Sequence, residues 1–319
     1  MGRKIFLHPF DSVRDTFVRP SASEKTRQCC LLSIETVFHM VKQQERPFIQ
    51  PSHLRLFMLD VGPLFVADDT HSGVPFFQPW PIERLDSHPI LLSDPAVNRA
   101  VTISKEAMDR GPPSLRKYGF PVQSRVKILN NVFVNHVQNR PRAGPEGQNE
   151  SLTAITGWKH LDGYTPWLGP DTVERPEWAC NGAWVQPGNK SPHFKAVMYS
   201  AIGGSEECLL RGEVLTILGI MMERLQIESL KKHLIIPVML FSFMGPRHGR
   251  ILLAYFDGRQ LVIRKSPLYQ FTSRDEGSMQ LFARYQAAEI GVGVTTDLPT
   301  IDRREFRFST GGLPRGWYL

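Results

Sequence analysis

The stretch HGRILLAYFDGRQLVIRKS, residues 248–266, decides the fold of this chain. It consists of two apolar runs that meet at Asp257-Gly258. An Asp-Gly pair between two such runs predicts a β-hairpin with a type I′ turn, because that turn needs positive φ at both central positions. We therefore expect two antiparallel strands, with Asp257 either turning the hairpin or serving a site at the end of the first strand.

The segments on either side of the hairpin extend this prediction. Residues 205–230 have apolar side chains at helical spacing behind Ser205, a residue that caps helices well. Residues 233–243, HLIIPVMLFSF, are apolar almost throughout, which is typical of a strand covered on both faces. A second helix is expected at 278–290. The order predicts an αβββα core in the C-terminal half of an α/β (α+β) protein, with a mixed central sheet flanked by helices.

The rest of the chain predicts a loop-rich N-terminal half. We expect helices at 21–45 and 97–110, two short strands within 53–73 that break at Gly62-Pro63, a strand or strand pair at 125–138, and a strand at 193–202. The Pro-rich stretch 74–90 is expected to be mostly loop. Residues 139–151 are polar and rich in Gly and Pro, which favours a linker. This divides the chain into an N-terminal α/β region, 1–145, which can pack on the same core, and a C-terminal part, 151–319.

Composition limits the classes of function. The chain has 319 residues, 41% of them hydrophobic, and a net charge of +7, which is compatible with a polyanionic partner. No apolar run approaches the roughly 20 residues of a membrane span, and the first residues lack the apolar core of a signal peptide. The four cysteines form no C-x-x-C pair. We expect an intracellular protein, cytoplasmic or nuclear, with no membrane partner; its oligomeric state is not predicted.

The order of elements resembles the core of the PD-(D/E)xK nuclease-like superfamily. There a glutamate on the first helix, an aspartate that ends the second strand and a (D/E)-x-K on the third strand bind Mg²⁺, which activates water against a phosphodiester. The matching positions are Glu213, Asp257 and Lys265, but Ile263 stands where the last acid is expected. The resemblance therefore implies a degenerate core that binds or processes nucleic acid, with Glu213 and Asp257 as ligands of Mg²⁺ or Mn²⁺.

Basic residues near this predicted core are candidates for phosphate contacts. Arg247, His248 and Arg250 form a dense basic loop, and Arg264 lies beside Lys265. Such side chains can contact the phosphates of duplex DNA or tRNA, although they are equally typical of a solvated turn.

Tryptophan is concentrated between residues 157 and 190, which contain four of the six in the chain, among them Trp167 and Trp178. Aromatic side chains on loops can line a ligand pocket or stack on bases. They can also cover a core where regular structure is scarce, so both interpretations stay open.

Two further patterns suggest other chemistry. In YQAAEI, Tyr285 and Glu289 are one helical turn apart, which resembles the Tyr-x-x-x-Glu pair of tRNA-dependent cyclodipeptide synthases. That resemblance implies an acyl transferase whose pocket these two residues flank, but the family's serine nucleophile has no counterpart here. A second candidate cation site contains the oxygen ligands Asp60, Asp68 and Asp69 with His71.

Residues 212–271 resemble a family of uncharacterised intracellular proteins from filamentous ascomycete fungi, which implies a source and no mechanism. Three hypotheses result: a nucleic-acid-binding or nucleic-acid-processing protein with a degenerate nuclease-like core, a tRNA-dependent acyl transferase, and a non-catalytic binding or scaffold protein.

Overall fold

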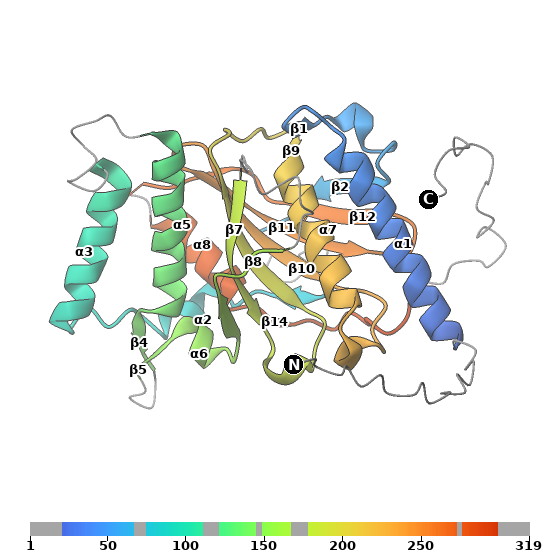
Figure 1. The fold of residues 1–319 in the computed structure, drawn as a ribbon. Helices are drawn as coiled ribbons and strands as arrows, with labels where there is room; N and C mark the ends of the chain where they lie inside the picture. Colours follow the sequence, from blue (N-terminus) through green and yellow to red (C-terminus); the bar gives the residue numbers. More distant parts are fainter. Residues whose placement is uncertain are drawn as a thin grey trace, which may run out of the picture.

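A mixed eight-stranded sheet forms the centre of the molecule, as Figure 1 shows. The computed structural model describes residues 21–66, 75–110, 121–144, 149–166, 178–272 and 276–298. The sheet has the order β2-β12-β11-β10-β8-β7-β6, with β13 paired to β11. Its strands are β2 (Leu59–Pro63), β6 (Lys159–Asp162), β7 (Trp178–Val185), β8 (Phe194–Ser200), β10 (Val238–Met244), β11 (His248–Phe256), β12 (Leu261–Lys265) and β13 (Tyr269–Gln270). The predicted α+β class with a mixed sheet is confirmed.

Helices cover both faces of this sheet. The described α-helices are α1 (Ala22–Lys42), α2 (Ile82–Asp86), α3 (Pro95–Arg110), α5 (Val122–Gln138), α6 (Leu152–Ile155), α7 (Arg211–Leu225) and α8 (Gly277–Gln286). Three short strand pairs lie outside the main sheet: β1 (Phe48–Ile49) with β9 (Leu209–Leu210), β3 (Phe77–Gln78) with β14 (Glu289–Ile290), and β4 (Pro141–Ala143) with β5 (Asn149–Ser151). Single 3₁₀ turns occur at Pro51–His53, Pro187–Asn189 and Glu228–Leu230.

The two faces of the sheet have separate cores. Val238 and Leu240 of β10 pack with α1 and α7, whereas Met239, Phe241 and Phe243 pack with α5 and α8. This alternation follows from the two-residue period of a strand. Because both faces are covered, β10 is apolar except for the buried Ser242, as its almost wholly apolar sequence predicted.

The hairpin of residues 248–266 is present, but its turn differs from the prediction. Phe256 of β11 pairs with Leu261 of β12, which leaves a four-residue loop instead of a two-residue type I′ turn. The Oδ1 atom of Asp257 accepts hydrogen bonds from the backbone N–H groups of Arg259 and Gln260, both at 2.8 Å. Gly258 takes φ 96°, which glycine adopts readily. Asp257 therefore turns the hairpin.

The unit β8-α7-β10 connects two parallel strands through a helix, as parallel pairing requires. The helix begins at Arg211, six residues later than the predicted cap at Ser205. Ser205 instead stabilises the preceding turn, because its Oγ atom accepts from the N–H groups of Glu207 and Cys208, both at 3.2 Å. The α-β-β-β-α order of the C-terminal half is as predicted, with β13 added before α8.

The N-terminal half joins the same sheet. β2 pairs in parallel with β12, so residues before the expected linker extend the core. The described part of 53–73 contains one strand, β2, instead of two, and this strand runs through Gly62-Pro63. Proline is tolerated at position 63 because β2 is at the edge of the sheet. The expected linker itself contains β4 and β5, which pair with each other.

Two other predictions of local structure were wrong. Residues 125–138 are helical, in α5, because Val126, Leu129, Phe133 and Val137 all lie on its buried side at helical spacing. The Trp-rich segment 157–190 contains β6 and β7 of the main sheet. The Pro-rich stretch is less irregular than expected, because half of its described residues, 75–90, belong to β3, α2 and an isolated bridge at Ile90.

Candidate functional site

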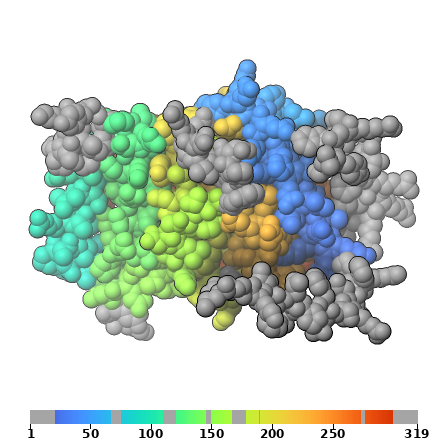
Figure 2. All heavy atoms as spheres, viewed as in Figure 1, coloured from blue at the N-terminus to red at the C-terminus, as the bar shows by residue number. Residues whose placement is uncertain are grey.

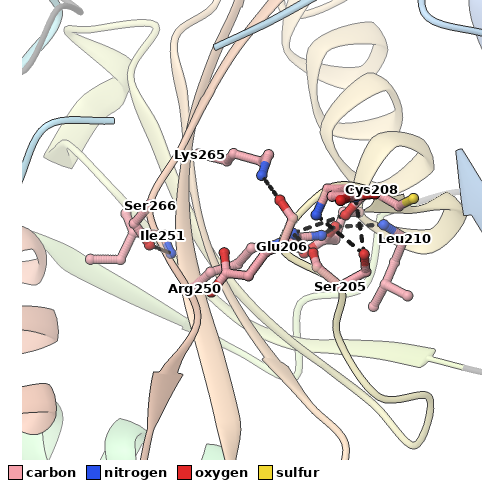
Figure 3. A network of polar contacts seen from close by, with 10 residues as sticks. Ser205, Glu206, Cys208, Leu210, Arg250, Ile251, Lys265 and Ser266 are labelled. Atoms are coloured by element: carbon pink, nitrogen blue, oxygen red, sulfur yellow. Dashed lines mark hydrogen bonds and ion pairs between the residues drawn. The ribbon is translucent and has the colours of Figure 1, made fainter. Parts of the chain in front are cut away.

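Glu213, the predicted metal ligand on the first helix of the core, is held by Arg250. Both side chains are fully buried, and the Arg250 Nε atom donates to Glu213 Oε1 at 2.8 Å, while Nη2 pairs with Oε2. Arg250 Nη1 also donates to the carbonyls of Ser205 and Cys208, both at 3.0 Å (Figure 3). Glu213 further accepts from the Leu210 N–H at 2.8 Å. Its carboxylate therefore ties α7 to β11 and to the loop before the helix.

Of the other two predicted nuclease-like residues, Asp257 lies far from Glu213. Asp257 comes seven residues after Arg250, just past the end of the same strand, about 23 Å away at roughly 3.3 Å per residue. Lys265 is nearer, and its Nζ atom donates to the Glu206 carbonyl (Figure 3). Burial and the neighbouring Arg250 lower the pKa of Lys265. The residues that the structure describes contain no group of three or more His, Cys, Asp or Glu side chains able to hold a metal ion.

The predicted phosphate contacts are already engaged in the fold. Arg264 forms an ion pair with Asp60 at 2.9 Å, across the β2–β12 pair. Arg247 donates to the Asp109 carbonyl at the end of α3, at 2.8 Å; in the described part of the chain, only the backbone of the partly buried His248 is paired, with Gln270 of β13. Asp68, Asp69 and His71 lie outside the described residues, so their grouping with Asp60 stays a prediction.

The tryptophans that are described belong to the core. Trp178 is 6% exposed and lies so close to Gly212 that a Cβ atom there would come within 2.4 Å of its ring. Trp158 is 4% exposed; its Nε1 atom donates to the Ala288 carbonyl, and the Lys195 ammonium lies 3.8 Å from its ring centre. Trp167 lies outside the described residues. Trp178 therefore fills the interior and lines no binding pocket of the predicted kind.

Tyr285 and Glu289 do not share a helix face. Tyr285 is buried near the end of α8, which stops at Gln286. Glu289 lies in β14 and pairs with Arg84 at the surface, at 2.5 Å. The spacing on which the resemblance to cyclodipeptide synthases depended is therefore absent.

A cavity that the sequence did not predict lies at the end of the molecule formed by α3 and α5. Its volume is about 280 Å³, and its walls come from α2, α3, α5, β4, α8 and the segments beside them. Figure 2 shows these two helices, in teal and green, at the opposite end of the surface from α1, in blue. Apolar side chains make up much of the wall, and His136, Arg140 and Arg142 form one part of it.

These three residues, here called the cationic centre, are positioned by the end of α5 and the start of β4. His136 is in the last turn of α5, Arg140 follows the helix, and Arg142 is in β4. Arg140 is 7% exposed and Arg142 is 3% exposed. Arg140 Nη1 lies 3.2 Å from His136 Nδ1, and Arg142 Nη2 lies 3.0 Å from His136 Nε2. The imidazole is thus held between two buried guanidinium groups.

The cationic centre has too few acceptors for its donors. A neutral imidazole has one N–H and one acceptor nitrogen, and a guanidinium has no acceptor at all. Whichever tautomer His136 adopts, one of its two contacts therefore sets an N–H against an N–H. Arg142 Nη1 does find the His88 carbonyl at 2.9 Å, but Arg140 Nη2 and Arg142 Nε are buried with no partner among the described residues.

Charge is also uncompensated at this centre. In the described part of the chain neither arginine forms an ion pair. Burial lowers the pKa of Arg140, and burial together with Arg140 lowers that of Arg142 to about 10. Burial first, and then Arg142 and Arg140, hold the pKa of His136 well below its usual range. The imidazole is therefore neutral at pH 7 and is a poor general base, because a proton on it would face two cations.

One signal in the sequence could have indicated this centre. HVQNRPR, residues 136–142, contains three basic residues in seven positions with no acid among them. The prediction of a strand or strand pair at 125–138 and of a linker at 139–151 gives no reason to bring these residues together.

Comparison of the chain with protein-family models, with curated proteins and with solved structures gives no match. The resemblances to fungal proteins, to PD-(D/E)xK nucleases and to cyclodipeptide synthases therefore stay predictions. Among the described residues, no helix is long and apolar enough to cross a membrane.

Proposed function

We propose that this protein binds a small organic anion, and that the cavity containing His136, Arg140 and Arg142 is the binding site. The observation that carries the proposal is the imidazole held between two buried guanidinium groups that no carboxylate pairs among the described residues. Buried charges are normally paired, because an unpaired one costs several kcal/mol. An anion in the cavity would supply the missing negative charge.

The shape of the site supports binding of a small molecule. A cavity of about 280 Å³ that is mainly apolar, with a few polar groups at one place, is close to the usual form of a ligand pocket. The neutral His136 between two cations favours holding an anion over proton transfer. The non-catalytic binding hypothesis thus gains a specific site, whereas the residues of the nuclease-like and acyl-transfer hypotheses remain apart from one another.

Equilibrium binding of benzoate, hexanoate, hexyl phosphate and inorganic phosphate, measured by titration calorimetry, tests the proposal. Arg142→Met removes one guanidinium, and Lys127→Met, at an exposed position of α5, removes the same charge outside the cavity. At least one organic anion is expected to bind wild type and Lys127→Met equally. Arg142→Met should weaken it tenfold or more, since a hydrogen bond to a charged group contributes about 1.5–3 kcal/mol.

Two results would overturn the proposal: none of the four anions binds, or Arg142→Met binds as wild type does. Arg140→Met is a second variant in case Arg142→Met does not fold, as judged by circular dichroism. Duplex DNA and tRNA, tested alongside, address the nucleic-acid hypothesis. If either nucleic acid binds, and Arg142→Met binds it as tightly as wild type does, its binding site lies outside the cavity.

A further inference from the structure

Much of the wall of the cavity is built from apolar side chains. Leu85 comes from α2, Ile90 from the segment after it, Val101 and Met108 from α3, Val132 from α5 and Met279 from α8. On α5, Val132 precedes His136 by one helical turn, so the apolar wall begins directly beside the cationic centre. A ligand that fills this cavity must join an anionic group to an apolar body.

The charges around the cavity favour a single negative charge on that ligand. Lys105, Arg140 and Arg142 are cationic, whereas Asp86 and Glu276 are acidic, which leaves +1 with His136 neutral. Lys105 and Glu276 neutralise each other, in an ion pair of 2.5 Å that joins α3 to the start of α8. A carboxylate balances the remaining charge, whereas a phosphate monoester, with about −1.5 to −2 at pH 7, exceeds it.

The volume of the cavity sets the length of the apolar body. A methylene group is similar in size to a water molecule, whose share of the liquid is roughly 30 Å³. A cavity of about 280 Å³ therefore holds roughly nine such groups, including the carboxylate. A chain of about 16 carbons would therefore extend out of the cavity, and its last carbons would gain no burial there.

We propose that the ligand of this site is a medium-chain aliphatic carboxylate of about eight to ten carbons, whose head group is held by His136, Arg140 and Arg142 and whose chain lies between α3, α5 and α8. This inference rests on the proposed function, because it names the class of anion that the same cavity takes. It goes further in specifying one negative charge, an apolar chain and an upper limit to the length of chain that the cavity buries.

Calorimetric titration with hexanoate, octanoate, decanoate and hexadecanoate, each below its micellar concentration, tests chain length. Each added methylene should tighten binding about fourfold up to decanoate, the gain expected for burying one CH₂. Hexadecanoate should gain nothing over decanoate. In the variant Val132→Phe, which narrows the cavity, the optimum should shift to a shorter chain, while Lys127→Met should keep the wild-type series.

Octan-1-ol, octyl phosphate and octyltrimethylammonium, compared with octanoate, test the head group. Octanoate should bind at least about tenfold more tightly than octan-1-ol in wild type, and this advantage should disappear in Arg142→Met. The cation should not bind. Tighter binding of octyl phosphate would overturn the assignment to carboxylates.

Different results would overturn the proposed anion binding and the inference that the anion carries an apolar chain. If hexanoate, octanoate and decanoate bind equally and still depend on Arg142, the proposed function stands and the apolar-chain inference is wrong. If no anion of any kind binds, both are wrong. If chain length matters but Arg142→Met has no effect, the apolar chain binds without the cationic centre, and the assignment of the head group is overturned.

Discussion

Replacing Glu213 by glutamine is expected to destabilise the protein strongly. Both members of the Glu213–Arg250 pair are 0% exposed, so the substitution leaves a guanidinium buried with a neutral partner. Removing one member of a buried pair typically costs about 3–5 kcal/mol. The amide oxygen introduced by Glu213→Gln can still accept from the Leu210 N–H, and Arg250 keeps its two carbonyl acceptors. We therefore expect a loss near the lower limit, about 3 kcal/mol.

Urea unfolding followed by tryptophan fluorescence and by circular dichroism measures this change in the free energy of unfolding. Coincident transitions from the two probes justify a two-state treatment. Glu207→Gln makes the same chemical change at an exposed position of the neighbouring loop and should alter stability by less than about 0.5 kcal/mol. The double variant Glu213→Leu with Arg250→Met should recover part of the loss, because it removes both buried charges.

The opposite outcome would refute this reasoning. If Glu213→Gln is as stable as wild type or more stable, the carboxylate is held there at the expense of stability, as functional carboxylates often are. The nuclease-like hypothesis would then regain support, particularly if millimolar Mg²⁺ or Mn²⁺ stabilised wild type and not the variant.

Three further predictions concern other buried groups. Gly212→Ala should lower the free energy of unfolding by about 1–3 kcal/mol, because the added Cβ atom overpacks against Trp178. In the double variant with Trp178→Leu this cost should be smaller; if the costs of the two single substitutions simply add, the two residues are not in contact. Burial lowers the pKa of His193 to about 4, so the stability contributed by its neutral form is present above pH 6.5 and is lost as pH falls toward 4. His193→Gln should flatten this part of the stability–pH profile in urea unfolding, and an unchanged profile would exclude His193 as its source. Arg140→Met should leave the ligand-free protein as stable as wild type or more stable, because it removes an uncompensated buried charge, and a loss of several kcal/mol would show a structural role instead.

The sequence predicted the C-terminal core because the secondary structure that each segment favours by itself is also the one in which its apolar residues pack together. The hairpin has two apolar runs and a turn residue between them, and β10 is apolar on both faces because helices cover both. The prediction for α5 was wrong because Val, Ile and Phe favour strands. Asn130 is buried and donates to the side chain of Asn181 at 3.0 Å, a contact over 51 residues that no local pattern contains.

The candidate site could not be predicted from the sequence either, because its residues are brought together by contacts between distant parts of the chain. The sequence indicates Glu213 as a metal ligand and not as half of a buried ion pair, because its partner Arg250 lies 37 residues away on another element. The cationic centre depends on α5 being a helix that ends at residue 138 and on a sharp return into β4. Without that turn, His136, Arg140 and Arg142 are three basic residues near a polar loop, and nothing indicates that they face one cavity.

The pKa of His136, measured by NMR of labelled histidine with and without saturating octanoate, tests the central claim most directly, because the reporter is part of the site. His136→Gln identifies its signal among those of the ten histidines. In the free protein the pKa should lie well below 6.5, because of burial and of the two arginines. A bound carboxylate should raise it, and by linkage octanoate should bind more tightly as the pH falls toward this raised pKa. A pKa of His136 that octanoate leaves unchanged would contradict the account.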